Sequence, residues 1–272
     1  MKNIDGWDFR EDHEKILSSK FETRGYVIEP GEEAYLNKMK KLIKDSFQSF
    51  VKDNIAGESN NVDLSRSHEI INASTNNDLR LHIIQEISQT TEFNRLYYLA
   101  AKNIIEELCG NELAMQKRVG LSINLPHNER DILPIHADTW NGVSPYELNI
   151  WIPFVNCSQS MSLYILEKDK YKQILASSSE LLKLNSDEIF KELERHLTWI
   201  EIKYGEILAF DQSLPHGYTK NLEKHTHWSL NCRFKGLHTP YWDKRLGEYF
   251  MPITAKCCTR IGIGYEYPEE WL

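Results

Sequence analysis

Apolar residues in the first hundred positions recur at three- and four-residue intervals, the spacing of an amphipathic helix. This spacing runs through residues 32–52, 78–88 and 92–108. A polar stretch at 55–61 ends the first run, and Cys109-Gly110 ends the last, as glycine commonly ends a helix. The pattern predicts three helices and a helical support over about residues 1–112.

From about residue 115 the period changes to two, which is typical of a strand with one apolar and one polar face. Residues 116–125, 147–154 and 225–234 all alternate in this way. Each polar face could simply face water. However, most polar positions carry Asn, Ser, His or Arg rather than the Lys and Glu of solvated faces, and they flank candidate ligands. We therefore expect these polar faces to line a pocket.

The combined pattern predicts a mainly β fold with surrounding helices. Its centre would be a double-stranded β-helix, a jelly-roll or cupin-like core over about 113–240, packed against the N-terminal helices. A helical insertion is expected over about 178–196 and a C-terminal extension over 241–272. We find no internal repeat or linker, so we expect residues 1–272 to form one domain.

Composition narrows the possible functions. The formal charge of −8 argues against a nucleic-acid partner, which usually meets a basic surface. The sequence has no apolar leader and no apolar run of about 18 residues, so we expect a cytoplasmic protein without a membrane partner. The five cysteines include no Cys-x-x-Cys pair, and their odd number argues against a disulfide framework.

The strongest chemical signal is a candidate metal triad. His136 and Asp138 lie two positions apart, which would place both side chains on one face of an extended segment. His216 follows 78 positions later (216 − 138), in a Pro-His-Gly bend after a predicted strand. Each half is weak evidence alone, since a lone His is more often structural. Together, two imidazoles and one carboxylate can hold Fe(II) and leave coordination positions open.

These motifs resemble a known family. His136-x-Asp138, Trp151-Ile-Pro153 and Leu214-Pro-His-Gly217 with Asn221 are similar to the phytanoyl-CoA-hydroxylase-like branch of Fe(II)/2-oxoglutarate oxygenases. Residues 133–140 and 229–235 are similar to oxygenases of bacterial carbohydrate-biosynthesis clusters, including a streptomycin-pathway type. The resemblance covers about residues 115–240. It implies Fe(II), dioxygen and 2-oxoglutarate, which is converted to succinate.

The resemblance also implies an arginine about eleven positions after the distal histidine, where this chain has His227. His227 would be a weaker, pH-dependent clamp for the distal carboxylate of 2-oxoglutarate. Arg233 and Ser229 share its polar face, and we expect Arg233 with Ser229 to hold that carboxylate. Arg118 is a further candidate. The expected lining of the co-substrate pocket comprises Asn124, Asn149 and Trp151.

Trp140, Asn141 and Tyr146 follow the His-x-Asp segment on a predicted loop. Aromatic and amide groups suit a sugar, although Trp140 is equally typical of a packing residue. We expect a small-molecule substrate, a carbohydrate or nucleotide-linked sugar from bacterial polysaccharide or natural-product biosynthesis. The expected reaction is hydroxylation or a related C–H oxidation.

Two other functions fit the same residues. One is a cupin-like isomerase or epimerase with another divalent metal, because these ligands bind several metals. The other is a carbohydrate-binding protein on a degenerate oxygenase scaffold, which the intact triad disfavours. The sequence does not predict the oligomeric state.

Overall fold

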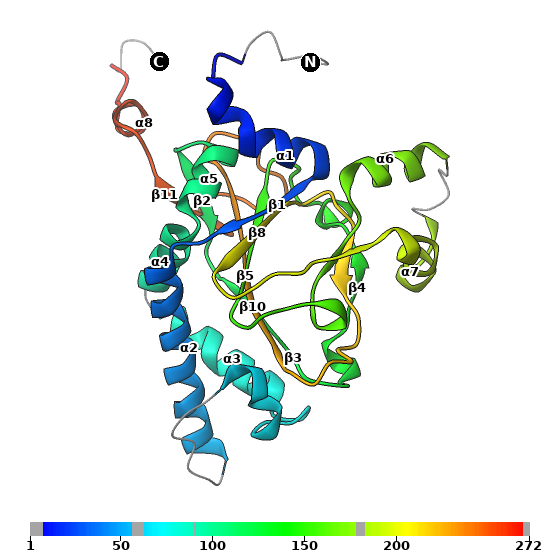
Figure 1. Ribbon diagram of the computed structural model, residues 1–272. Helices are drawn as coiled ribbons and strands as arrows, with labels where there is room; N and C mark the ends of the chain where they lie inside the picture. The colour runs from blue at the N-terminus through cyan, green and yellow to red at the C-terminus, as the bar shows by residue number, and fades with distance from the viewer. Residues whose placement is uncertain (1–7, 56–62, 90, 178–182, 269–272) are drawn as a thin grey trace.

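The computed structural model describes residues 8–55, 63–89, 91–177 and 183–268 (Figure 1). Its α-helices in these ranges are α1 (Ile16–Arg24), α2 (Glu33–Asn54), α3 (Asn76–Ile87), α4 (Glu92–Ala100), α5 (Lys102–Cys109), α6 (Lys168–Ser177), α7 (Ser186–Leu193) and α8 (Cys257–Ile263). Its strands are β1 (Tyr26–Pro30), β2 (Leu113–Gln116), β3 (Gly120–Asn124), β4 (Leu133–His136), β5 (Leu148–Pro153), β6 (Tyr164–Ile165), β7 (Thr198–Trp199), β8 (Glu206–Asp211), β9 (His216–Tyr218), β10 (His227–Gly236) and β11 (Phe250–Thr254).

Two antiparallel sheets form the β core. The larger has the order β1-β8-β5-β10-β2-β11, with β3 also paired to β10, and the smaller has the order β4-β9-β6-β7. Side chains connect the sheets. Trp151 Nε1 on β5 donates to Tyr218 Oη on β9 at 2.6 Å, and Arg233 on β10 contacts Asp138 just after β4. The polar faces of β5 and β10 therefore point toward the smaller sheet, as the alternation predicts.

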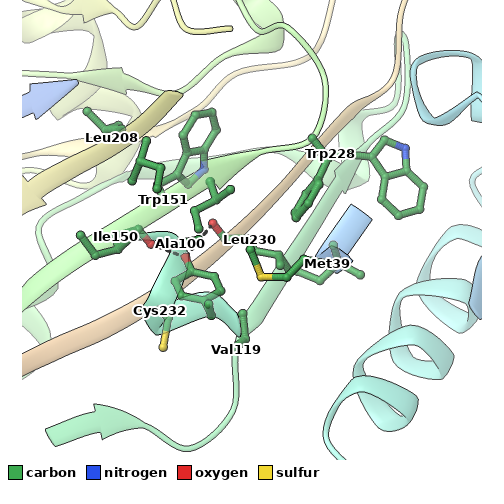
Figure 2. Close-up of a cluster of buried hydrophobic side chains, with 14 of the residues drawn as sticks. Met39, Ala100, Val119, Ile150, Trp151, Leu208, Trp228, Leu230 and Cys232 are labelled. Atoms are coloured by element: carbon green, nitrogen blue, oxygen red, sulfur yellow. Dashed lines mark hydrogen bonds between the residues drawn. The ribbon is translucent and has the colours of Figure 1, made fainter. Parts of the chain in front are cut away.

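Helices cover the opposite face of the larger sheet. In Figure 1, α2, α3 and α4 lie on one side of the sheet and β4 on the other. The apolar positions of β3, β5 and β10 join one buried cluster with apolar residues of these helices. Tyr97 on α4 also donates a hydrogen bond to the Ile150 carbonyl oxygen on β5 at 2.7 Å. Figure 2 shows part of this core, with side chains from α2, α4, β5 and β10 drawn together.

The predicted helices 32–52 and 78–88 appear as α2 and α3. The prediction of one helix over 92–108 is wrong, because the backbone leaves helical geometry at Ala101 and separates α4 from α5. The predicted strand 116–125 is observed only in part. Its residues Gly120–Asn124 form β3, which pairs with His227–Asn231 of the ten-residue β10. Gln116 instead ends the separate strand β2, whose residues 113–115 pair with Phe234–Gly236 of β10.

The helical insertion is shorter than predicted. Residues 178–182 lie outside the described ranges, and the helix α7 begins at Ser186, after an Asn185 cap that exchanges hydrogen bonds with Glu188. The sequence pattern missed α6. It also missed β1 and β11, which lie in the predicted helical support and C-terminal extension and form the two edges of the larger sheet.

Two expectations from composition bear on the described part of the chain. None of its helices combines the length and apolar character needed to cross a membrane. All five cysteines lie within it, and their thiols are free.

Candidate metal centre

The two candidate histidine ligands lie opposite each other on neighbouring strands. In the antiparallel pair of β4 and β9, His136 is in register with His216, and their ring centroids are 4.4 Å apart. Strand pairing thus brings together residues that are 80 positions apart in sequence (216 − 136). Asp138 follows β4 at the start of a short 3₁₀ turn. The potential ligand atoms of the three residues all lie within 4.8 Å of one another.

Both imidazoles are held with Nε2 free to bind a metal. His136 Nδ1 donates to the Pro134 carbonyl oxygen at 2.9 Å, and His216 Nδ1 donates to the Leu214 carbonyl oxygen at 2.8 Å. A carbonyl oxygen can only accept, so Nδ1 carries the proton and Nε2 keeps its lone pair in the neutral ring. Burial, together with nearby His136, lowers the pKa of His216 to about 4. That ring is therefore neutral near pH 7.

Asp138 completes a donor set that fits a divalent metal ion. Asp138 is 6% exposed, and its Oδ2 has no hydrogen-bond partner among the described residues. A buried, unpartnered carboxylate oxygen is energetically unfavourable, and a cation would stabilise it. Two imidazoles with free Nε2 atoms beside one carboxylate match the ligand types of a non-haem iron site.

Arg233 connects this donor set to the larger sheet. Its Nη2 donates to Asp138 Oδ1 at 2.8 Å, and its Nη1 donates to Tyr249 Oη at 2.6 Å. Its Nε donates to Gln212 Oε1 at 3.4 Å. Burial alone would lower the pKa of Arg233, but Asp138 and Tyr249 raise it overall. Arg233 is therefore a charged group that several hydrogen bonds fix in place, and it contacts a candidate metal ligand.

His227 lies in a different, uncharged environment. It is fully buried, its Nε2 is 2.7 Å from Ser229 Oγ, and its Nδ1 is 3.5 Å from Cys157 Sγ. The rings of Trp151 and Tyr218 pack against it. Burial lowers the pKa of His227 to about 4, so it carries no charge near pH 7. This environment does not fit the distal carboxylate of 2-oxoglutarate, which needs a cation.

Arg233 and Ser229, which we expected to hold the distal carboxylate of 2-oxoglutarate together, do not contact each other. Ser229 contacts His227 instead, and four residues of extended strand separate the two positions by about 13 Å. The predicted pocket residues fall into two groups. Asn124 pairs in register with His227, and Asn149 pairs in register with Arg233. Only the group with Arg233 contacts a candidate metal ligand, through the hydrogen bond from Arg233 to Asp138.

The remaining predicted residues lie outside this buried centre. Arg118, Asn141 and Tyr146 are exposed. Trp140 is half-buried among apolar residues, and its Nε1 donates to Tyr171 Oη on α6 at 3.1 Å. Trp140 thus has the contacts of a packing residue, while Asn141 and Tyr146 remain accessible on the loop after the candidate ligands.

Sequence reasoning missed several residues around Arg233. Gln116, Gln212 and Tyr249 contact its side chain, and Glu147 and Lys244 lie close enough to interact with its charge. Strand alternation gave a signal for Gln116 and Glu147, which occupy polar positions. Tyr249 and Lys244 come from the C-terminal extension, where no periodic pattern pointed to the site.

Two surface cavities lie away from these residues. One of about 470 Å³ lies between β1 and the β7 region, and one of about 300 Å³ lies between α4 and β11. Neither is lined by a candidate metal ligand. We locate the candidate site by its donor atoms rather than by the size of a cavity.

The fold is similar to that of solved non-haem oxygenases. ThoJ, a non-heme monooxygenase solved as a nickel complex, superposes with a TM-score of 0.58 at 10% identity, covering 88% of this chain and 84% of ThoJ. EctD from S. alaskensis, solved with 2-oxoglutarate and 5-hydroxyectoine, gives a TM-score of 0.55 at 14% identity, covering 86% of this chain and 80% of EctD. These likenesses confirm the predicted jelly-roll fold class.

No protein-family profile matches the chain, and no curated protein sequence matches it. At identities this low, the structural likeness establishes the fold. Activity has to be inferred from the side chains of the site itself.

Proposed function

We propose that this protein is an Fe(II)- and 2-oxoglutarate-dependent oxygenase. It would hydroxylate or otherwise oxidise a C–H bond of a sugar or sugar-derived intermediate in bacterial polysaccharide or natural-product biosynthesis. The observation that carries the proposal is the arrangement of His136, Asp138 and His216, with their ligand atoms within 4.8 Å of one another. Fe(II) bound there would activate dioxygen while 2-oxoglutarate is converted to succinate.

The residues of the chain have separate roles in this proposal. His136 and His216 would bind the metal through Nε2, and the Pro134 and Leu214 carbonyl oxygens fix the orientation of the rings. Asp138 would bind through its carboxylate, which Arg233 orients from the opposite sheet. Loss of such a hydrogen bond to a metal ligand typically lowers metal affinity about 10- to 100-fold.

Arg233 is also the proposed anchor for the distal carboxylate of 2-oxoglutarate. Its planar guanidinium has five N–H donors, and Asp138, Tyr249, Gln212 and Gln116 engage most of them. Anchoring a second carboxylate would therefore require Arg233 to share or exchange one of these contacts. Ser229 and His227, in the uncharged half of the pocket, would at most contact neutral parts of the ligand.

The loop after the candidate ligands supports the proposal of a sugar substrate. Asn141 and Tyr146 are exposed there, and they offer an amide and an aromatic ring to a ligand that approaches the metal. An aromatic face and hydrogen-bonding groups together suit a sugar ring.

A turnover assay tests the proposal. The purified protein is incubated with Fe(II), ascorbate and 2-oxoglutarate, with and without a panel of sugars, and succinate is measured. We expect succinate that depends on Fe(II) and is lost in His136→Ala. Succinate formation that persists in His136→Ala would count against the proposal. The absence of succinate from the wild-type protein with every candidate substrate would also count against it.

One observation favours a second candidate, a metal-dependent isomerase or epimerase. The position that aligns with the arginine of the resembled branch holds the uncharged His227, and Arg233 is already paired with Asp138. An enzyme that used no 2-oxoglutarate would need no free cation in the pocket to anchor a distal carboxylate. Metal-dependent conversion of a sugar without 2-oxoglutarate would favour this alternative.

A further inference from the structure

Buried polar atoms without partners are concentrated beside Arg233. In the described part of the chain, nine buried side-chain nitrogen and oxygen atoms lack a hydrogen-bond partner. Five of the nine belong to Asp138, Glu147, Asn149 and Gln212. Asp138 is a candidate metal ligand, which accounts for one of these five atoms. The other four belong to Glu147, Asn149 and Gln212, of which only Asn149 was expected to line the co-substrate pocket.

These residues form one group on the inner faces of the larger sheet. Asn149 is in register with Arg233, and Glu147 lies two residues earlier on the same face. Gln212 follows β8, and its backbone carbonyl accepts a hydrogen bond from the Thr139 N–H at 3.4 Å. Its Oε1 accepts from Arg233, and its Nε2 is buried without a hydrogen-bond partner among the described residues. The group therefore lies directly beside the candidate metal ligands.

Glu147 is the most informative member. It is 4% exposed, and neither carboxylate oxygen has a hydrogen bond of ordinary geometry among the described residues. Burial raises its pKa against the opposing effects of the nearby cations and the Ser144 backbone. The three nearby cations each have another contact. Lys235 Nζ donates to the Pro240 carbonyl oxygen at 2.6 Å, Arg233 binds Asp138, and Lys244 Nζ lies 4.8 Å from the centroid of the Tyr249 ring. A carboxylate buried in this way is destabilising unless a ligand or water supplies hydrogen-bond donors.

The unpartnered atoms define the chemistry that would satisfy them. Glu147 and Asn149 offer acceptors, and Gln212 Nε2 offers a donor. The surrounding Arg233, Lys235 and Lys244 disfavour an ammonium group, and Glu147 disfavours an anion. Neutral hydroxyl groups, which both donate and accept, fit this set best.

Two exposed aromatic residues lie on segments close to Glu147. Tyr146, next to Glu147 in sequence, is 55% exposed, and Trp242 is 64% exposed. The segments that carry them are joined, because Ser144 Oγ donates to the Pro240 carbonyl oxygen at 2.9 Å. Exposed aromatic rings are suited to pack against the apolar face of a sugar-like ligand.

We propose that Glu147, Asn149 and Gln212 form a binding site for the hydroxyl groups of a neutral polyhydroxylated small molecule, presented beside Asp138. The site deepens the proposed function, because it names the residues that would select the substrate. Its existence as a binding site does not depend on iron or 2-oxoglutarate.

The test measures ligand binding without turnover. Saturation-transfer NMR and thermal unfolding of the full chain would use methyl glucoside and myo-inositol as neutral probes, with glucosamine and glucuronate as charged counterparts. Glu147→Gln preserves shape and removes the charge, and Asn149→Ala removes a second acceptor. Glu192→Gln, at an exposed position on α7, is the matched control.

We expect at least one neutral probe to bind the wild-type protein and the control equally. Glu147→Gln should weaken that binding about 10- to 100-fold, the loss typical of hydrogen bonds to a charged group. Without a probe, Glu147→Gln should unfold at the same or a higher temperature than the wild type. A lower temperature would instead identify Glu147 as a structural partner of the nearby cations and overturn the proposal.

Binding of neither neutral probe, binding unaffected in both variants, or a preference for glucosamine would also overturn the proposal. A parallel metal titration separates this result from the proposed function. If probe binding depends on Glu147 but the wild-type protein binds no metal, the hydroxyl site stands and the oxygenase assignment fails. If metal binds and the probes do not, the proposed hydroxyl site fails and the oxygenase assignment stands.

Discussion

The uncharged state of His227 makes a specific prediction about acid stability. Burial lowers its pKa from the ordinary value of 6.5 to about 4. At about 1.4 kcal/mol for each pH unit, this difference corresponds to roughly 3 kcal/mol. The unfolded chain takes up the proton near pH 6.5 and the folded protein only near pH 4. The stability from neutral His227 is therefore present above pH 6.5 and lost as the pH falls toward 4.

The assay is urea unfolding of metal-free protein at about pH 7 and about pH 4.5. In His227→Gln, the stability lost between these pH values should be smaller than in the wild type by about 2–3 kcal/mol. His216 titrates in both proteins, so its contribution cancels in the comparison. His225→Gln, at an exposed position two residues earlier, is the control and should behave like the wild type.

Equal pH dependence in His227→Gln and the wild type would refute this reasoning. That result would mean that His227 accepts a proton in the folded protein as readily as in the unfolded chain. It would then be available as a cation near pH 7, and the assignment of the carboxylate anchor to Arg233 would lose its main support.

Three further predictions concern the metal centre. Asp138→Ala should abolish metal binding and lower the free energy of unfolding by about 3 kcal/mol, because the buried Arg233 loses its carboxylate partner; unchanged stability in urea would contradict a buried ion pair. Arg233→Lys should raise the 2-oxoglutarate concentration needed for half-maximal succinate formation about tenfold or more, because the two-pronged contact is lost; an unchanged requirement would place the anchor elsewhere. Gly217→Ala should lower stability by about 1–3 kcal/mol, because the added Cβ would lie 2.5 Å from the Leu133 carbonyl oxygen. Its control in thermal unfolding is Gly262→Ala, where an added Cβ meets no described atom within 4 Å, and equal effects of the two would contradict the predicted clash.

Local sequence patterns predicted the features that depend on local geometry. Alternation of apolar and polar positions predicted β5 and β10 and the faces they present, because a strand side chain repeats its direction every two residues. The His136-x-Asp138 and Pro-His-Gly motifs marked the candidate ligands. Their convergence requires the register of β4 against β9, which no local pattern encodes.

Features that depend on long-range pairing were missed. The expectation that Arg233 and Ser229 hold 2-oxoglutarate together stays a prediction. It followed from their shared face, and the contact of Ser229 with His227 could not be read from that face. Alternation placed Glu147 on a polar face that we expected to line a pocket, but only the structure shows that Glu147 is buried close to Arg233. Tyr249 reaches Arg233 from the C-terminal extension, and only the pairing of β11 with β2 brings that segment to the site.

The central claim is that His136, Asp138 and His216 hold one Fe(II) to which 2-oxoglutarate binds. Anaerobic calorimetric titration tests it most directly, first with Fe(II) and then with 2-oxoglutarate. The account predicts one metal per chain, loss of that site in His216→Ala, and binding of 2-oxoglutarate only to the metal-loaded protein. Metal binding that survives His216→Ala, or 2-oxoglutarate binding that is indifferent to the metal, would contradict it.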